Sequence, residues 1–379
     1  MSATTDRTPE PASTPERATG VEPGDSVRRR RAARPRGARQ LDSTALIYLV
    51  LVAVIAVSAV LTGIEGRNFF SQGNIWAVLT AMSVLGLIAI GQTLVILVGS
   101  LDLSVPYVVS LATVIAAGGM KGLDGNIPAA VFNTLAVCAV IGLVMGLLVS
   151  LLHVHGFIAS LGIGLVVSGY LGTNYQGSHG AAAPDLRLLG RSGIVGWIPT
   201  AFLVLLACAV LVTLMLRYTR LGHHVYAIGG NRDVARMSGV RIALPVVSAH
   251  VLCSVLAGLA ALLLLSRTGV GSPTIGSQGR YDLLSIAAVV LGGTLLAGGK
   301  GSVVGTMGGV AIFAVLDNVM GVMQVNPFLK DFVRGLVIVL AVAVYARRSV
   351  VRRPPRFGAS RPVLPVPAAK GPSTKGEPA

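Results

Sequence analysis

The chain has 379 residues, of which 53% are hydrophobic and only 12% are charged, and its formal net charge is +16. Soluble domains carry about 25% charged residues, so this composition excludes an ordinary soluble globule and favours a membrane protein. Residues 1–42 and 347–379 supply +3 and +7 of the net charge, leaving the segment between them poor in charge. A basic nucleic-acid-binding domain is therefore excluded, and no nucleic-acid partner is expected.

The first 42 residues predict a disordered Arg/Pro-rich tail. Pro9, Pro11, Pro15 and Pro23 stand among Ser, Thr and Glu, a composition that cannot bury a core. The run of arginines from Arg28 to Arg31 then precedes an apolar segment near 44–62, as in a signal peptide. That segment is as long as a bilayer span and many similar ones follow it, which favours a retained first helix.

In chain order, ten apolar segments approach the roughly 20 residues that cross a bilayer. They lie near 44–62, 75–98, 104–119, 127–152, 156–172, 199–216, 246–266, 284–297, 302–320 and 332–346. The third, fifth, eighth and tenth are short, which leaves open whether they cross completely or are broken. We therefore predict an all-α polytopic membrane protein with about ten transmembrane helices, residues 43–346 forming the transmembrane domain.

Positive charge predicts the orientation, because cytoplasmic loops carry an excess of Lys and Arg. Both basic ends, 1–42 and the disordered tail 347–379, should be cytoplasmic, which requires an even number of crossings. The strongest internal basic segment has five arginines between residues 217 and 241, opposed only by Asp233. After six crossings this segment also lies inside. The lipid bilayer of a bacterial inner membrane is therefore the expected location, and 26 Arg against 5 Lys suits a GC-rich bacterial genome.

Glycines recur at four-residue spacing in two of the apolar segments. Gly142 and Gly146 form one pair, and Gly301, Gly305 and Gly309 form a longer series. Small residues at this spacing let helix backbones approach closely. We expect tight packing within one chain rather than a seam between two copies.

Enzymatic motifs are missing from the sequence. Residues 293–301 resemble a phosphate-binding loop, but the spacing is one residue too long and Gly301 stands where the Ser or Thr is needed. The histidines form no metal pair, and Cys138, Cys208 and Cys253 lie apart in apolar runs, as buried apolar residues do. We expect no catalytic residue, no metal site and no cofactor bound by this chain.

Polar residues within or beside the apolar segments are candidates for a substrate pathway, because such groups are costly in hydrocarbon. They are Gln92, Thr93, Asp102, Asp317 and Asn318. Gln92 and Thr93 suit a neutral polyol or a neighbouring helix equally well. Asp102 is favoured as a cap of the next helix over a ligand contact, and Asp317 needs a partner, for which Arg334 is the candidate. No ladder of acids and histidines crosses the segments, which argues against an ion-coupled pump.

The cytoplasmic segment 217–245 predicts a short helix that begins at Asn231, with Asp233 in its first turn. It would present Val234, Met237 and the flanking arginines to the cytosol. Such a helix suits a groove in another protein. The alternative is an interfacial helix held by anionic lipid through its arginines.

Three ordered stretches resemble the permeases of ribose-type ABC sugar importers, within the branched-chain amino acid/ribose/xylose permease superfamily. They are GQTLVILVGSLDLS from Gly91, the segment from Thr219 through Gly229-Gly230-Asn231 to Val240, and AAVVLGGTLLAGGKG from Ala287 with the following Asp317-Asn318. The resemblance spans roughly residues 70–346.

The resemblance implies a permease that passes a monosaccharide from an extracytoplasmic solute-binding protein through the membrane. Its partners would be a second copy or a homologous permease and an ABC ATPase subunit that hydrolyses the ATP. The residues implied in coupling to that ATPase are Gly222, Gly229, Gly230, Asn231, Asp233, Arg236, Ser238 and Gly239. Sequence alone leaves open a gradient-driven secondary carrier, a membrane scaffold, and the same fold carrying a nucleoside, an autoinducer sugar or an amino acid.

Overall fold

The computed structural model describes residues 43–194 and 196–351, with only the backbone for residue 43 and for residues 341–351. Its elements are α1 (Ser43–Ile64), α2 (Gln72–Leu97), α3 (Val105–Met120), a 3-10 turn η1 (Asp124–Asn126), α4 (Ile127–Ser150), α5 (Gly156–Asn174), α6 (Pro184–Arg191), β1 (Gly193–Ile194), β2 (Ile198–Pro199), α7 (Thr200–Tyr218), α8 (Arg220–Gly230), α9 (Arg232–Met237), α10 (Ala243–Thr268), α11 (Ile275–Gln278), α12 (Tyr281–Leu291), α13 (Val303–Val322) and α14 (Pro327–Val351). The predicted tail 1–42 and residues 352–379 of the second tail lie outside the described residues, while α14 continues into the segment predicted as the second tail.

Each of the ten predicted apolar segments coincides with a helix. Within the described chain, seven helices are long and apolar enough to cross a membrane, namely α1, α2, α4, α5, α7, α10 and α13. α3 and α12 are also apolar but have only 16 and 11 residues. The all-α polytopic fold is therefore confirmed, in a protein that spans the membrane several times.

The eighth predicted segment, 284–297, is only partly helical. α12 ends at Leu291, and the chain from 292 to 302 forms a tight, non-helical turn before α13. The cause lies in the glycines, because Gly293 and Gly298 have φ angles of 84° and 88° that an α-helix cannot contain. This segment is thus broken, one of the outcomes left open by its short apolar run.

α2 and α10 form the centre of the bundle. α10 packs against α2, α3 and α4, and its buried face contributes residues such as Ala257 and Ala260 to the main core cluster. A Cβ at Gly142 would lie 2.6 Å from the His250 carbonyl oxygen, and one at Gly146 would lie 2.5 Å from the Val247 Cα. The GxxxG pair therefore packs against α10 of the same chain, as predicted.

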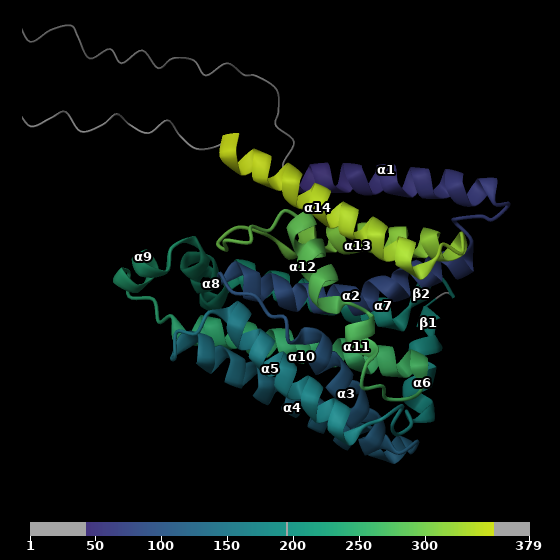
Figure 1. Ribbon diagram of the computed structural model, residues 1–379, viewed down its shortest axis with the longest axis horizontal. Coiled ribbons are helices and arrows are strands. Elements are labelled where there is room, and N and C mark those ends of the chain that lie inside the picture. Colours follow the sequence, from purple (N-terminus) through teal and green to yellow (C-terminus); the bar gives the residue numbers. More distant parts are fainter. Residues whose placement is uncertain (1–42, 195, 352–379) are drawn as a thin grey trace, which may run out of the picture. The chain divides into compact units, whose positions relative to one another are not determined.

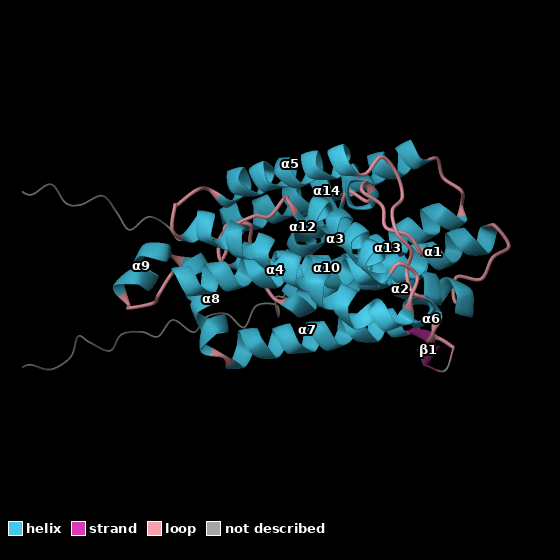
Figure 2. Ribbon diagram, turned by 90° about the horizontal axis from the view of Figure 1, so that it is seen from below, coloured by secondary structure: helices cyan, strands magenta, loops and turns pink. Residues whose placement is uncertain are grey.

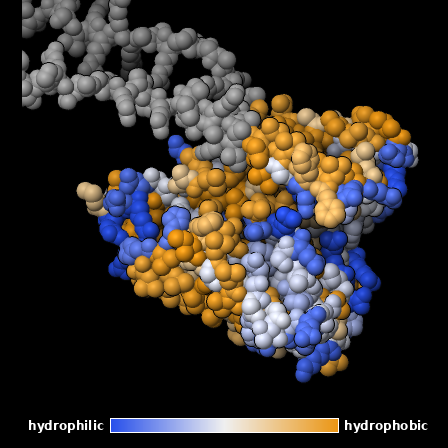
Figure 3. All heavy atoms as spheres, in the orientation of Figure 1, coloured by the Kyte–Doolittle hydropathy of each residue, from blue (hydrophilic) through white to orange (hydrophobic). Residues whose placement is uncertain are grey.

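Large apolar side chains cover the outside of several helices. Val52 and Val60 of α1 are 65% and 63% exposed, and Val166 of α5 is 72% exposed. Figure 3 shows such residues, in orange, over much of the surface between two hydrophilic ends. A surface of this kind is suited to lipid, whose hydrocarbon offers no partners for polar groups.

The hydrophilic ends carry different elements. α8 and α9 lie at one end, and α6 with the short β1–β2 hairpin lies at the other (Figure 1). The view turned by 90° agrees, with α9 and β1 at opposite ends of the helices (Figure 2). β1 and β2 pair antiparallel in the connection between α5 and α7, which also contains the unpredicted helix α6.

Candidate functional site

Two short helices, α8 and α9, connect α7 to α10. α8 follows Thr219, whose side-chain oxygen accepts a hydrogen bond from the backbone N–H of Gly222 at 3.2 Å. α9 follows Asn231, whose Oδ1 accepts bonds from the backbone N–H groups of Asp233 and Val234, both at 3.0 Å. Such a side chain satisfies donors that the first helical turn leaves free. The predicted helix start at Asn231, with Asp233 in the first turn, is confirmed.

α9 presents its apolar side chains outward. Met237 is 88% exposed and Val234 is 57% exposed, while Ala235 faces the rest of the chain. The helix ends at Met237 with Ser238 as its C-cap, and the following Gly239 has a φ of 80°. The predicted exposure of Val234 and Met237 is therefore confirmed.

α8 is tied to the turn before α13. The hydroxyl of Tyr226 donates a hydrogen bond to the carbonyl oxygen of Gly301 at 3.0 Å. Burial raises the pKa of Tyr226, and the positive charge of Arg217 lowers it by a smaller amount. The phenol therefore stays protonated at neutral pH and keeps its role as the donor.

The C-terminal end of α8 meets two other turns. Gly229 and Gly230 lie against Leu97 and Gly99 at the end of α2 and against Gly298 and Gly299 in the 292–302 turn. The backbone N–H of Gly299 donates to the Leu97 carbonyl oxygen at 3.0 Å. The three sequence stretches that resemble the sugar permeases thus come together at one place.

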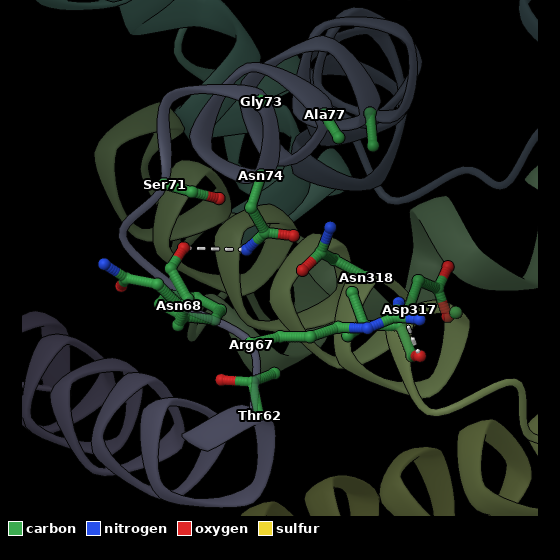
Figure 4. Close-up of a pocket in the computed structure, with 13 residues that line it drawn as sticks. Thr62, Arg67, Asn68, Ser71, Gly73, Asn74, Ala77, Asp317 and Asn318 are labelled. Atoms are coloured by element: carbon green, nitrogen blue, oxygen red, sulfur yellow. Dashed lines mark hydrogen bonds between the residues drawn. The ribbon is translucent and has the colours of Figure 1, made fainter. Parts of the chain in front are cut away.

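A cavity of about 730 Å³ lies at the far end of α13 from α8. It is lined by the loop after α1, the start of α2 and the end of α13, specifically by Thr62, Arg67, Asn68, Phe69, Ser71, Gly73, Asn74, Ala77, Ala81, Asp317, Asn318, Gly321 and Val322. Asp317 and Asn318 are two of the five predicted pathway residues. The structure brings these two together with several polar residues from segments distant in sequence (Figure 4).

The polar groups of this cavity are unequally satisfied. Asn74 donates from Nδ2 to the Phe69 carbonyl oxygen at 2.9 Å, and Arg67 donates to the Val322 carbonyl oxygen at 3.2 Å. The Oδ1 of Asn318 has no hydrogen-bond partner among the described residues. An amide oxygen accepts hydrogen bonds from water or ligand hydroxyls, but this one is buried and becomes accessible only if the surrounding helices move.

Asp317 belongs to a chain of ion pairs at the rim of the cavity. Its Oδ1 accepts a hydrogen bond from the Nε of Arg334 at 2.8 Å, so the predicted pairing is confirmed. Arg334 also pairs with Asp331 at 3.1 Å, and Asp331 pairs with Arg280 at 3.3 Å. The ion pairs join α13, α14 and the residue before α12.

Sequence reasoning missed Arg67, Asn68 and Asn74 as members of this cavity. A signal for them was present, because polar residues from Arg67 to Asn74 separate the first two apolar segments. Their proximity to the end of α13 depends on how α1 and α13 pack, which no local pattern indicates.

Gln92 and Thr93 lie inside the bundle and do not line the cavity. Both are 0% exposed. The Oγ1 of Thr93 lies 2.8 Å from the Oγ1 of Thr306 and joins α2 to α13. Gln92 Oε1 lies 3.9 Å from the thiol of Cys253 on α10. In this structure both polar residues contact neighbouring helices.

Asp102 is also fully buried, in the turn before α3. Its Oδ1 accepts a bond from the backbone N–H of Ser104 at 2.9 Å, which closes the turn ahead of the helix. Ser104 is the N-cap residue and none of the helix's own N–H groups bonds to Asp102, so the predicted cap is corrected to a turn that leads into the helix. The Oδ2 lies 3.9 Å from the Nδ1 of His250, a partner that sequence reasoning missed.

Across residues 44–194 and 196–340, no three His, Cys, Asp or Glu side chains gather as a metal site would require. The three cysteines are free thiols; Cys138 and Cys253 are buried, as predicted, and Cys208 is half-buried.

Known proteins match most of the chain. Residues 74–342 match the family described as "Branched-chain amino acid transport system / permease component". The Escherichia coli (strain K12) ribose import permease protein RbsC is 36% identical over 299 residues, which cover 78% of this chain and 92% of that protein. The Bacillus subtilis (strain 168) ribose import permease protein RbsC is 34% identical, covering 77% and 91%.

The Haemophilus influenzae galactose/methyl galactoside import permease protein MglC is 33% identical, covering 79% of this chain and 92% of that protein. The comparison with solved structures found no match. The matched residues include α8, α9, α13 and α2 from Asn74 onward. The chain therefore belongs to the branched-chain amino acid transport system permease family and is a multi-pass bacterial inner-membrane transport protein, not an enzyme.

Proposed function

We propose that the chain is the membrane-spanning permease subunit of an ABC importer for a monosaccharide such as ribose or xylose. The observation that carries this proposal is the 36% identity to a ribose import permease over 92% of that protein's length. The match to a galactose/methyl galactoside import permease supports the wider class of monosaccharides.

The energy for import would come from a separate ATPase subunit that contacts α8 and α9. The exposed Met237 and Val234 support a docking surface, and the basic charge of this segment supports a cytoplasmic position. The residues proposed to serve this contact are Gly222, Gly229, Gly230, Asn231, Asp233, Arg236, Ser238 and Gly239. The chain itself would bind no cofactor, and its partner would bind and hydrolyse ATP.

The chain would cross the membrane ten times with both termini in the cytoplasm. Tyr48, near the start of α1, donates to the Val304 carbonyl oxygen at the start of α13, which is next to α8. α14 begins beside the end of α13 and runs back toward the α8 end (Figure 1). The start of α1 lies near the α8 end, and α14 runs back toward that end. Both observations support an even number of crossings, in accord with the two basic tails.

Sugar would enter at the opposite, extracytoplasmic end, where a solute-binding protein delivers it. A neutral sugar needs hydrogen-bonding groups rather than a net charge. Asn318, Asn74 and Arg67 offer such groups in the outer cavity, and the carboxylate of Asp317 is neutralised by Arg334. Closure of the ATPases on ATP would then rearrange the bundle and expose the sugar to the cytoplasm, with a second copy or a homologous permease completing the path.

The test is sugar import by proteoliposomes that contain this permease, an ABC ATPase subunit and a sugar-binding protein. We expect ribose or a related pentose to stimulate ATP hydrolysis and to accumulate inside only when all three are present. Import by the permease alone, abolished when an ion gradient is collapsed, would instead identify a secondary carrier.

The docking assignment has its own variants. Asp233→Ala, Arg236→Ala and Gly239→Val should weaken assembly with the ATPase and lower the sugar-stimulated hydrolysis. If import and assembly are unchanged in all three variants, the docking assignment is rejected. The importer proposal would still stand.

A further inference from the structure

Three backbone segments cross without side chains between them at the end of α8. We call this place the glycine junction and define it by Gly99, Gly229, Gly230, Gly298 and Gly299. Gly99 follows α2, the Gly229–Gly230 pair ends α8, and the other two lie in the 292–302 turn. The junction thus joins the segment that faces the cytoplasm to both the α2–α3 and the α12–α13 connections.

The crossing at Gly229 leaves no room for a side chain. A Cβ at this position would overlap the carbonyl oxygen of Leu97 and the backbone nitrogen of Gly299. These two groups are also hydrogen-bonded to each other at 3.0 Å. Gly229 therefore rests directly on a backbone hydrogen bond that connects α2 with the 292–302 turn.

The neighbouring glycines support the same geometry. Gly99, Gly298 and Gly299 have φ angles of 79°, 88° and 72°, in the left-handed region that residues with a Cβ rarely adopt. A Cβ at Gly298 would lie 2.9 Å from the nitrogen of Gly99 and 3.1 Å from the Cα of Gly229. The backbones of all three segments are thus in contact at one point.

Gly230 differs from Gly229 although the two are adjacent. A Cβ at Gly230 would have no atom within 4 Å and its φ is not in the left-handed region. The backbone of Gly230 still lies against the turn, since a Cβ at Gly299 would be 2.5 Å from the Gly230 nitrogen. The control glycine is therefore Gly162 in the middle of α5, outside the junction, where a Cβ would also have no atom within 4 Å.

Tyr226 adds a second tie between α8 and the same turn. Its hydroxyl reaches the Gly301 carbonyl oxygen, about one helical turn before Gly230. With two attachments along its length, α8 cannot rotate or slide without moving the 292–302 turn. The contact at Leu97 passes the same displacement to the turn that holds Asp102 and begins α3.

We propose that the glycine junction is the relay that couples the ATPase-facing segment to the membrane helices, with Gly229 and Tyr226 as its positioning residues. The proposal rests on the importer function proposed above. Side chains in a flexible contact absorb small displacements by changing rotamer, whereas a backbone-to-backbone contact has no such freedom. A shift of α9 by the partner would therefore reach α2, α3 and α13 with little loss.

The experiment compares Gly229→Ala with Gly162→Ala in the reconstituted three-component importer. The readouts are assembly with the ATPase, ATP hydrolysis and the number of sugar molecules imported per ATP hydrolysed. Gly229→Ala should lower that ratio about tenfold, within the roughly 5–150-fold range of typical coupling energies, while hydrolysis continues. Gly162→Ala should keep the wild-type ratio.

Tyr226→Phe keeps the experiment decisive if Gly229→Ala does not fold. It removes one hydrogen bond and adds no atom, so the transport ratio should fall about two- to tenfold with assembly unchanged. The relay would be overturned if Tyr226→Phe imports as many sugar molecules per ATP as the wild type. If Gly229→Ala folds, it would have to give the wild-type ratio as well. Absence of sugar-stimulated hydrolysis in the wild type would instead reject the proposed function, so the two failures are distinguishable.

Discussion

Asp102 and His250 face each other in the interior of the bundle, and both are 0% exposed. Asp102 Oδ2 and both ring nitrogens of His250 have no hydrogen-bond partner among the described residues. Polar groups in such a place usually have a partner or a bound water. Since Asp102 also closes the turn before α3, the pair joins that turn to α10.

A double-mutant cycle tests this pairing. Asp102→Asn and His250→Gln should each destabilise the purified chain in detergent, because each leaves a buried group without its counterpart. The double variant should be less destabilised than the sum of the two, with an interaction free energy of about 0.5–3 kcal/mol. Thermal or denaturant unfolding provides the measurement. Additive effects would mean that the two side chains do not interact.

Asn318 lines the outer cavity, and its Oδ1 is buried without a hydrogen-bond partner in the described chain. Asn318→Ala should lower the maximal import rate about two- to tenfold at saturating sugar-loaded binding protein, the effect of one lost hydrogen bond. Its unfolding temperature should stay close to that of the wild type.

Asn74→Ala is the control from the same cavity. Its amide holds the Phe69 carbonyl oxygen, so this variant should mainly lower stability. An Asn318→Ala variant that unfolds early and imports at the wild-type rate would contradict the role in sugar passage.

At the scale of elements, α9 stands out because its apolar side chains face away from the chain. Met237, at 88% exposure, is suited to fill a pocket in the partner ATPase. Met237→Asp should weaken association about tenfold or more, since a central interface residue commonly contributes more than 1 kcal/mol. Met237→Leu keeps the apolar volume and should bind normally.

Copurification and titration with the ATPase measure this effect. Equal affinity of both variants would mean that α9 does not dock. A helix held by anionic lipid would instead lose vesicle binding when Arg232 and Arg236 are neutralised.

Local signals predicted several elements well. Asn231 satisfies the first N–H groups of α9, a contact within three residues, so its side chain predicted the helix start. Glycines at four-residue spacing likewise predicted close packing, because the spacing places them on one face. Gly292 and Gly293 follow Leu291 and explain why α12 ends there. The apolar composition alone had extended the predicted segment to residue 297.

Local sequence signals of this kind could not predict the long-range contacts. The outer cavity combines a loop near residue 67, the start of α2 and the end of α13. His250 sits in an apolar run that gives no indication of Asp102 as its neighbour. Asp317 and Arg334 were predictable as a pair only because a short connection separates their helices.

At the scale of the whole molecule, the two hydrophilic ends should lie on opposite sides of the membrane. Ser238 directly follows α9 at one end and Ser178 lies in the loop after α5 at the other, and both are exposed. By the positive-inside rule, the five arginines of 217–241 would place the α9 end in the cytoplasm. The same orientation would put the outer cavity on the side where a sugar-binding protein arrives.

Two variants that each add one exposed cysteine test this arrangement as a matched pair, Ser178→Cys and Ser238→Cys, in a background with Cys208→Ser. Cys138 and Cys253 are each 1% exposed and should stay unlabelled. A membrane-impermeant maleimide should label Ser178→Cys in right-side-out vesicles and Ser238→Cys only after the membrane is opened. The reverse pattern would mean that the molecule has the opposite orientation in the membrane. Labelling of both variants from the same side would reject an odd number of crossings between α5 and α9. Because α7 is the one long apolar helix that the structure describes between these positions, the result depends on that single crossing.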